Sequence, residues 1–328
     1  MNRRLGLIAL VAASAATISG AMTPARAEGI ARMGFVHADS PDNEPPAVKA
    51  FWQRLRELGW IEGQNLVIVS RIADGQSAPL LKLMTEIAQS KVDVIFTLTT
   101  PAALAAKGTT STIPIVAAAV DDPVGSGVIH SLARPEGNIT GFSLGLGDEL
   151  IGKFLELLQE IVPRLSTVAV ISDPDNAINR RITETLEGMS SRTRLQLRFI
   201  HLKQLNALDR VFALARRKAQ AAVVLSNSLT VAHRQEVAAM AARYRLPTIY
   251  ALGEFVDAGG LIAYHPDQVL MFRHAAEYVD KILKGVSPRD LPFEQPTRFL
   301  LSLNLTAARA LGLKIPDTIL LRADRVIQ

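Results

Sequence analysis

The chain has 328 residues, no cysteine and a formal net charge of +5. Its length exceeds the roughly 250–300 residues at which a single hydrophobic core stops growing, so two domains are expected. The lack of cysteine excludes disulfides, thiol catalysis and cysteine-ligated metal. Without Arg3, Arg4 and Arg26 the balance is 33 basic against 31 acidic side chains, or +2. The remaining charge does not favour a nucleic-acid partner.

Residues 1–27 have the features of a cleaved export signal. A basic start precedes an apolar run, and Ala25 and Ala27 supply the small-x-small pattern of a cleavage site. The alternatives are an N-terminal helix or a membrane anchor, but polar residues and glycine interrupt the run before it reaches the ~20 residues of a spanning helix. We therefore expect export with cleavage near Ala27, and no stable membrane insertion.

The rest of the chain repeats one pattern of elements, with an offset of about 130 residues. Apolar runs rich in β-branched residues alternate with amphipathic stretches such as 48–58, which predicts parallel sheets with helices on both faces. Two similar α/β units imply two lobes and a cleft between them. The first set of strand segments is 33–43, 65–71, 92–97 and 113–117; the second is 168–176, 195–200, 221–226 and 246–250.

Segments rich in turn-forming residues mark the expected connections between the lobes. Residues 133–142 are taken as the first crossing and 258–264 as the second, and the tail supplies a third. The tail is expected to contain a helix, a proline-punctuated loop, a strand and a final helix. The expected lobes are 28–141, completed by about 262–296, and 142–261, completed by about 297–328.

Candidate ligand contacts follow from the rule that open parallel sheets bind ligands beyond the carboxyl ends of their strands. Thr99 and Thr100, at a predicted helix start, offer hydroxyls and free N–H groups to an anion; alternatively, Thr100 only caps its own helix. Asp122 also precedes a predicted helix start, where it either caps or meets an ammonium group. Asn227 lies at the corresponding tip of the second unit.

Weaker candidates lie in three other places. Asp39 and Ser40 follow the first strand, and Glu254 follows the last strand of the second unit, where an exposed glutamate is more often solvated than functional. Tyr264, beside a proposed crossing, is either a wall of the cleft or part of the core.

Catalytic signatures are missing from the sequence. It contains no HExxH pair, no Gly-x-Ser-x-Gly turn, no phosphate-binding loop and no Gly-x-Gly-x-x-Gly dinucleotide turn. We therefore expect a protein that is not an enzyme and that needs no metal and no cofactor.

Six segments together resemble one family across essentially the whole chain after the signal. They are 55–66, 100–107, 122–128, 132–141, 254–261 and 304–316. The chain resembles the bacterial ABC-transporter substrate-binding proteins, and more narrowly the group related to tryptophan-binding lipoproteins, which have the type I periplasmic-binding fold. The resemblance implies two Rossmann-like lobes joined by three crossings.

The resemblance also implies a function and a set of contacts. A periplasmic monomer would capture a small polar or amino-acid-like solute by hinge closure and present it to an ABC permease and its ATPase. Thr99 and Thr100 would hold a carboxylate, Asp122 and Asn227 would make polar or ammonium contacts, and Glu254 would lie at the cleft edge. The alternative is a ligand-binding sensor that signals to a membrane receptor. His265 departs from the family pattern, so amino-acid specificity does not follow from the resemblance alone.

Overall fold

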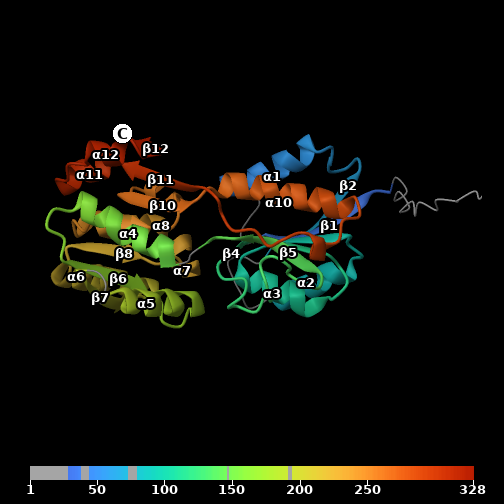
Figure 1. Cartoon of the computed structure of the whole chain (residues 1–328), viewed down its shortest axis with the longest axis horizontal. Coiled ribbons are helices and arrows are strands. Elements are labelled where there is room, and N and C mark those ends of the chain that lie inside the picture. Colours follow the sequence, from blue (N-terminus) through green and yellow to red (C-terminus); the bar gives the residue numbers. More distant parts are fainter. Residues whose placement is uncertain (1–28, 38–43, 73–79, 146–147, 191–193) are drawn as a thin grey trace, which may run out of the picture.

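The protein, described by a computed structural model, consists of two α/β lobes side by side along its longest axis (Figure 1). The structure describes residues 29–37, 44–72, 80–145, 148–190 and 194–328. One five-stranded and one seven-stranded sheet form the centres of the lobes. The predicted fold class is confirmed, and the expected export signal lies outside the described residues.

The N-terminal lobe is built on an all-parallel sheet of order β2-β1-β3-β4-β5. Its strands are β1 (Ala31–His37), β2 (Leu66–Ile72), β3 (Val94–Leu98), β4 (Ile115–Val120) and β5 (Ile139–Ser143). Its helices are α1 (Pro46–Glu57), α2 (Leu80–Gln89), α3 (Thr100–Thr109) and α10 (Gln268–Leu283). Apolar residues of α1 and α10 form the core on one face of the sheet, and those of α2 and α3 form it on the other.

The C-terminal lobe is built on a sheet of order β12-β11-β10-β9-β8-β6-β7. Its strands are β6 (Thr167–Ser172), β7 (Gln196–His201), β8 (Ala221–Val224), β9 (Thr248–Tyr250), β10 (Ile262–Pro266), β11 (Phe299–Asn304) and β12 (Arg325–Ile327). The pairing is parallel except between β10 and β11.

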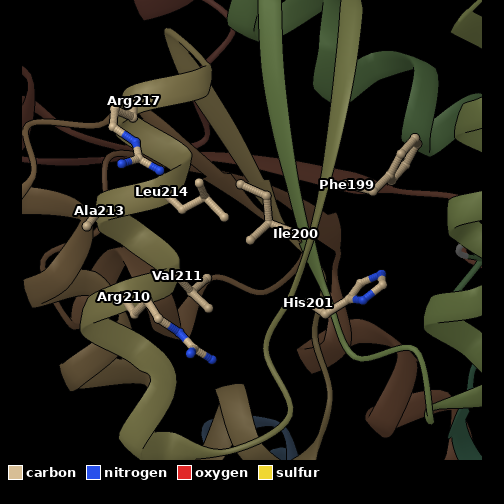
Figure 2. Close-up of a pocket in the computed structure, with 8 residues that line it drawn as sticks. All are labelled: Phe199, Ile200, His201, Arg210, Val211, Ala213, Leu214 and Arg217. Atoms are coloured by element: carbon tan, nitrogen blue, oxygen red, sulfur yellow. The ribbon is translucent and has the colours of Figure 1, made fainter.

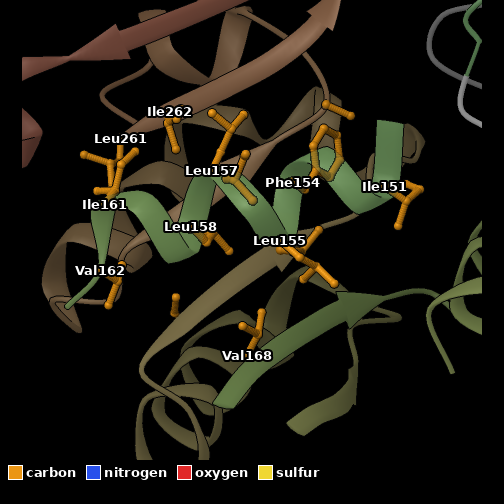
Figure 3. Packing of buried hydrophobic residues seen from close by; sticks show 14 of the residues in the cluster. Ile151, Phe154, Leu155, Leu157, Leu158, Ile161, Val162, Val168, Leu261 and Ile262 are labelled. Carbon is orange, nitrogen blue, oxygen red and sulfur yellow. The ribbon is translucent and has the colours of Figure 1, made fainter. Parts of the chain in front are cut away.

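Helices cover both faces of this second sheet. They are α4 (Asp148–Ile161), α5 (Ala177–Ser190), α6 (Leu208–Lys218), α7 (Ser228–Ala232), α8 (Arg234–Arg243), α9 (Glu254–Asp257), α11 (Leu305–Leu311) and α12 (Asp317–Leu320), with short 3-10 turns at Leu205–Ala207 and, in the other lobe, Pro288–Asp290. Figure 3 shows how α4 packs on the strands through residues such as Phe154 and Leu158, both fully buried. Helices α6, α8 and α9 contribute to the core on the opposite face.

The chain passes between the lobes three times, after β5, between β10 and α10, and before β11. The first and third connections run side by side, because the N–H of Ser143 donates to the carbonyl of Glu294 at 2.9 Å. The N–H of Asp267, in the second connection, donates to the carbonyl of Arg298 at 3.0 Å. These bonds link both the first and the second connection to the third.

The second connection lies later than the sequence analysis expected. Strand β10 pairs with β9 and β11 in the larger sheet, so the chain leaves this lobe only after Pro266, and residues 258–264 do not form the crossing. The glycines at 259 and 260 instead form the turn between α9 and β10 within the lobe. The first connection likewise follows β5, which ends at Ser143, rather than residue 141.

Candidate functional site

The tip of β3 in the N-terminal lobe carries the two threonines predicted as anion ligands. Thr99 precedes α3 with φ 69° and ψ 155°, a region nearly restricted to glycine, and its side chain makes no capping hydrogen bond. Thr100 is buried, and its Oγ1 accepts from the N–H of Asp121 at 3.2 Å. The alternative in which Thr100 caps its own helix is therefore wrong, and the first N–H groups of α3 have no side-chain acceptor from this residue.

Asp121 lies directly behind Thr100 at the end of β4. Its Oδ2 accepts from the Thr100 hydroxyl at 3.4 Å. Burial raises the pKa of Asp121 to about 6, against the opposing effects of the Thr100 hydroxyl and the Arg181 guanidinium. A carboxyl in this setting responds strongly to a positive charge placed nearby, because such a charge favours its ionised form.

Asp122 does not begin a helix, contrary to the expectation from its sequence. Residues 123–127 form turns, because glycines at 125 and 127 favour tight bends over helix, and Asp122 Oδ1 accepts from the N–H of Gly125 at 3.0 Å. Its Oδ2 forms an ion pair with Arg181 Nη1 of α5. Since α5 belongs to the C-terminal lobe, this pair joins the two lobes.

A small hollow of about 90 Å³ surrounds the Asp122–Arg181 pair. Both lobes and two of the connections line it, which places it between the lobes. Its walls comprise Asp121, Asp122, Pro123, Val124, Leu132, Ser143, Gly145, Arg181 and Gln295. Two carboxylates and one guanidinium dominate its chemistry, so it suits a ligand that carries charge of both signs.

The tip of β8 supplies the second lobe's polar groups. Asn227 caps α7: its Oδ1 accepts from the N–H of Thr230 at 2.9 Å, and its own N–H donates to Thr230 Oγ1 at 3.0 Å. Asn227 Nδ2 and Ser226 Oγ are buried and have no partner among the described residues, and the same holds for Thr97 Oγ1 on β3. Buried polar groups are usually paired, so these three atoms are available to a bound molecule or to water.

The weaker candidates Glu254 and Tyr264 lie within the C-terminal lobe. Glu254 begins α9 and is half-buried near His265, whose pKa is lowered by burial while the charge of Glu254 acts in the opposite direction. Tyr264 stacks on Phe299 with ring centroids 5.6 Å apart and packs against the core of its lobe. Neither residue lines the hollow between the lobes. Asp39 and Ser40 lie outside the described residues.

Arg181 was not a sequence candidate, although it completes the site. It comes from the helix that follows the β6 tip, where a charged residue looks like part of a solvated face. Asn179, two residues earlier, shows how this helix is fixed: its Oδ1 accepts from the N–H of Asp173 at 3.0 Å, and its Nδ2 donates to the carbonyl of Ser226 at 3.0 Å. The buried asparagine thus joins the β6 and β8 tips beside Arg181.

A larger hollow, of about 490 Å³, lies elsewhere, between β7 and α6 on the outer side of the C-terminal lobe (Figure 2). It contains none of the predicted ligand residues. Within the described part of the chain, no group of acidic and histidine side chains is arranged to hold a metal ion. None of the described helices is long and apolar enough to cross a membrane.

Comparison with known families decides the assignment of the chain. A family model described as ABC transporter substrate binding protein matches residues 30–327. The chain belongs to this family. The resemblance to this family, which the sequence segments predicted, is therefore confirmed.

One relative and two solved structures are similar to this chain. A tyrosine-binding protein of Clostridioides difficile (strain R20291) is 26% identical over 246 residues, which span 75% of this chain and 70% of that protein. A conserved domain protein of Vibrio cholerae O1 biovar eltor has a crystal structure with TM-score 0.81 and 26% identity, covering 90% of this chain and 99% of that one. An ABC domain from Streptococcus pneumonia, solved in complex with L-Trp, has TM-score 0.80 and 21% identity, with 90% and 99% covered.

Proposed function

We propose that this protein captures a small amino-acid-like solute between its lobes and delivers it to an ABC permease and its ATPase. The observation that carries the proposal is the meeting of charged groups from both lobes, Asp122 and Arg181, around a hollow beside the lobe connections. A ligand held by both lobes at once stabilises the closed arrangement, because each lobe contributes contacts that the open form lacks.

The chemistry of the site supports a zwitterionic ligand. Asp122, with Asp121 behind it, suits an ammonium group, while Arg181 and the uncapped start of α3 suit a carboxylate. The buried Asn227 Nδ2 adds a donor from the second lobe. The names of two relatives, one tyrosine-binding and one solved with L-Trp, support the same class of ligand.

The proposal also includes export to the periplasm and solute binding without catalysis. Residues 1–27 would direct export, so that the mature protein works in the periplasm, where solutes enter before transport. Binding and release would require no bond making or breaking, which agrees with a sequence that lacks catalytic motifs.

A ligand screen tests this proposal. We expect one or a few of the twenty amino acids to raise the melting temperature, since a ligand that binds only the folded state stabilises it by RT ln(1 + [L]/Kd). Isothermal titration calorimetry should then give one site, which is lost when Thr100 and Asn227 are both changed to alanine. No thermal shift from any amino acid, and no co-purified small molecule by mass spectrometry, would overturn the proposal. If a strain that lacks the permease still takes up the ligand, delivery to the permease is overturned, while solute binding stands.

A further inference from the structure

The larger hollow lies along a strand that has no neighbour on one side. Strand β7 is an edge of the seven-stranded sheet and pairs, among the described strands, only with β6. The N–H groups of Gln196 and Leu202 donate to β6 or the residues beside it. Because alternate residues of a strand direct their N–H and C=O groups to opposite sides, the backbone groups of Leu197, Phe199 and His201 face the open edge.

The neighbouring helix turns this edge into a groove with apolar walls. Ile200 points toward Val211 and Leu214 of α6, while Phe199 and His201 point to the other side of the strand (Figure 2). The groove therefore combines a row of hydrogen-bonding backbone groups with an apolar surface. This combination suits an extended peptide, which adds hydrogen bonds along its backbone and inserts alternate side chains.

The rim of the groove is basic. Arg210 and Arg217 stand two helical turns apart on α6, roughly 10 Å along its axis. Neither arginine has a hydrogen-bond or ion-pair partner among the described residues, and no acidic residue lines the groove. The nearest acid along the helix, Asp209, bonds Arg243 at 2.7 Å and Tyr244 at 2.9 Å. The groove is therefore complementary in charge to an acidic segment.

A second copy of this chain does not fit the same edge. An edge-to-edge pair would bring two basic rims together, and the exposed Arg198 of each β7 would add to the repulsion. We propose that the groove between β7 and α6 binds an extended, acidic segment of a partner protein, which adds to the sheet as a strand beside β7. This surface is separate from the hollow between the lobes, so a partner can occupy it whether or not solute is bound.

Two fluorescein-labelled peptides test the charge requirement, with the sequences EVEVEVE and KVKVKVK. By fluorescence anisotropy with the full chain, we expect the glutamate peptide to bind at least tenfold more tightly. The R210Q/R217Q variant should weaken this binding at least tenfold. The control variant R216Q/K218Q removes the same charge from exposed positions on the same helix that do not line the groove, and should change binding less than threefold. No binding of the glutamate peptide, or an equal loss in both variants, would overturn the proposal.

A second pair of probes tests the strand arrangement. The glutamate peptide is N-methylated either on all its valine amides or on all its glutamate amides. Only alternate amides of an added strand face β7, so one of the two peptides should lose at least tenfold in affinity and the other should not. Equal binding of both would mean that charge alone holds the peptide and would overturn strand addition. Complete displacement by citrate at an equal carboxylate concentration would instead assign the groove to small anions.

Discussion

The two lobes use one scaffold but finish its equivalent tips in opposite ways. In the N-terminal lobe, Thr99 precedes α3 with a strained backbone and no side-chain cap. In the C-terminal lobe, Asn227 precedes α7 with extended backbone and a complete capping box with Thr230. The first tip thus leaves helix N–H groups available to a ligand, whereas the second satisfies its helix and offers only the other end of the asparagine side chain.

In the proposed function, this difference would let a duplicated fold hold a ligand that is not symmetric. In the proposed function, one lobe would contribute backbone donors and carboxylates, through α3, Asp121 and Asp122, and the other would contribute side-chain donors, through Asn227 and Arg181. A ligand with two unlike ends can then contact a different kind of group on each side. Substitutions at each tip can therefore separate its contribution to stability from its proposed contribution to ligand binding.

The largest effect is expected from Asn227→Asp. Aspartate keeps the oxygen that accepts from Thr230 and is as good an N-cap as asparagine, but it removes the buried amide donor. We expect the affinity for the amino acid identified by the screen to fall at least tenfold, since a hydrogen bond to a charged group contributes about 1.5–3 kcal/mol. Calorimetric titration measures the affinity. The free energy of unfolding is measured beside it, and we expect it to fall, because the carboxylate oxygen that replaces the amide nitrogen is buried without a partner.

A matched control is Asn304→Asp, which alters another asparagine cap in the same lobe. Asn304 accepts from the N–H of Ala307 at 2.9 Å at the start of α11, and among the described residues its side-chain nitrogen is not one of the buried atoms left without a partner. Its variant should bind the ligand like the wild type. An equal loss of affinity in both variants would show that Asn227 acts only through the stability of its lobe.

The next effect concerns Asp121, the half-buried carboxyl that follows β4 in the N-terminal lobe. Burial raises its pKa to about 6, above the ordinary value of an aspartate, so the folded protein binds this proton more tightly than the unfolded chain does. The resulting stability is fully present below about pH 4 and is lost as the pH rises through 6. Asp121→Asn removes the cost of ionisation, and we expect a gain of about 1–3 kcal/mol in the free energy of unfolding at pH 7.

Urea unfolding of the Asp121→Asn variant at several pH values measures this gain. The difference from the wild type should shrink as the pH falls from 6 to 4, because both side chains are then neutral. A difference that does not depend on pH would contradict the assigned ionisation. Ligand affinity should fall in the variant, because the carboxylate that faces an ammonium group is gone.

A smaller effect is expected from the strain at Thr99. The backbone there has φ 69° and ψ 155°, where any side chain with a Cβ is strained by about 1–3 kcal/mol. Thr99→Gly should therefore be about 1 kcal/mol more stable than Thr99→Ala, which keeps the Cβ, by chemical denaturation. Equal stabilities would mean that the tip is relaxed, and the contrast with Asn227 would then rest on capping alone.

The scaffold could be predicted from sequence more fully than the tips could. Buried strands such as Val94–Leu98 and Ala221–Val224 are nearly continuous apolar runs, because helices cover both faces of the sheet, and such runs are visible in any sequence. The short edge strand Arg325–Ile327 was not predicted, since it is mostly exposed and has no such run. The antiparallel pair of β10 and β11 was also missed, because pairing direction leaves no local pattern.

The site was predicted in part for a related reason. Position at a strand end is a local property, and Thr100, Asp122 and Asn227 do lie at strand ends. Only Asp122 of these three lines the hollow between the lobes. The partner of Asp122 depends on how the second lobe stands against the first, so nothing near Arg181 in the sequence indicated that it would cross the gap. The sequence predicts a helix start after Asp122 because Pro123 suits the first helical position, yet the glycines that follow favour turns.

The smallest effect on stability is expected from the ion pair that joins the two lobes. Arg181 and Asp122 have side chains 45% and 21% exposed, and a pair of this kind contributes at most about 1 kcal/mol. Arg181→Gln should therefore change the free energy of unfolding by less than ~1 kcal/mol. The pair is nevertheless a direct side-chain bond between the lobes, so its loss should open the ligand-free protein and increase the radius of gyration measured by small-angle X-ray scattering.

Arg180→Gln is the control for this experiment, because Arg180 donates to the carbonyls of Pro174 at 3.0 Å and Asp175 at 3.3 Å within its own lobe. It removes the same charge from the neighbouring position without touching the other lobe, and its scattering should match the wild type. High salt should shift the wild type toward Arg181→Gln, since a partly exposed pair is screened. If both variants scatter like the wild type at every salt concentration, the lobes are held by their connections alone, and the difference between the tips concerns ligand recognition rather than closure.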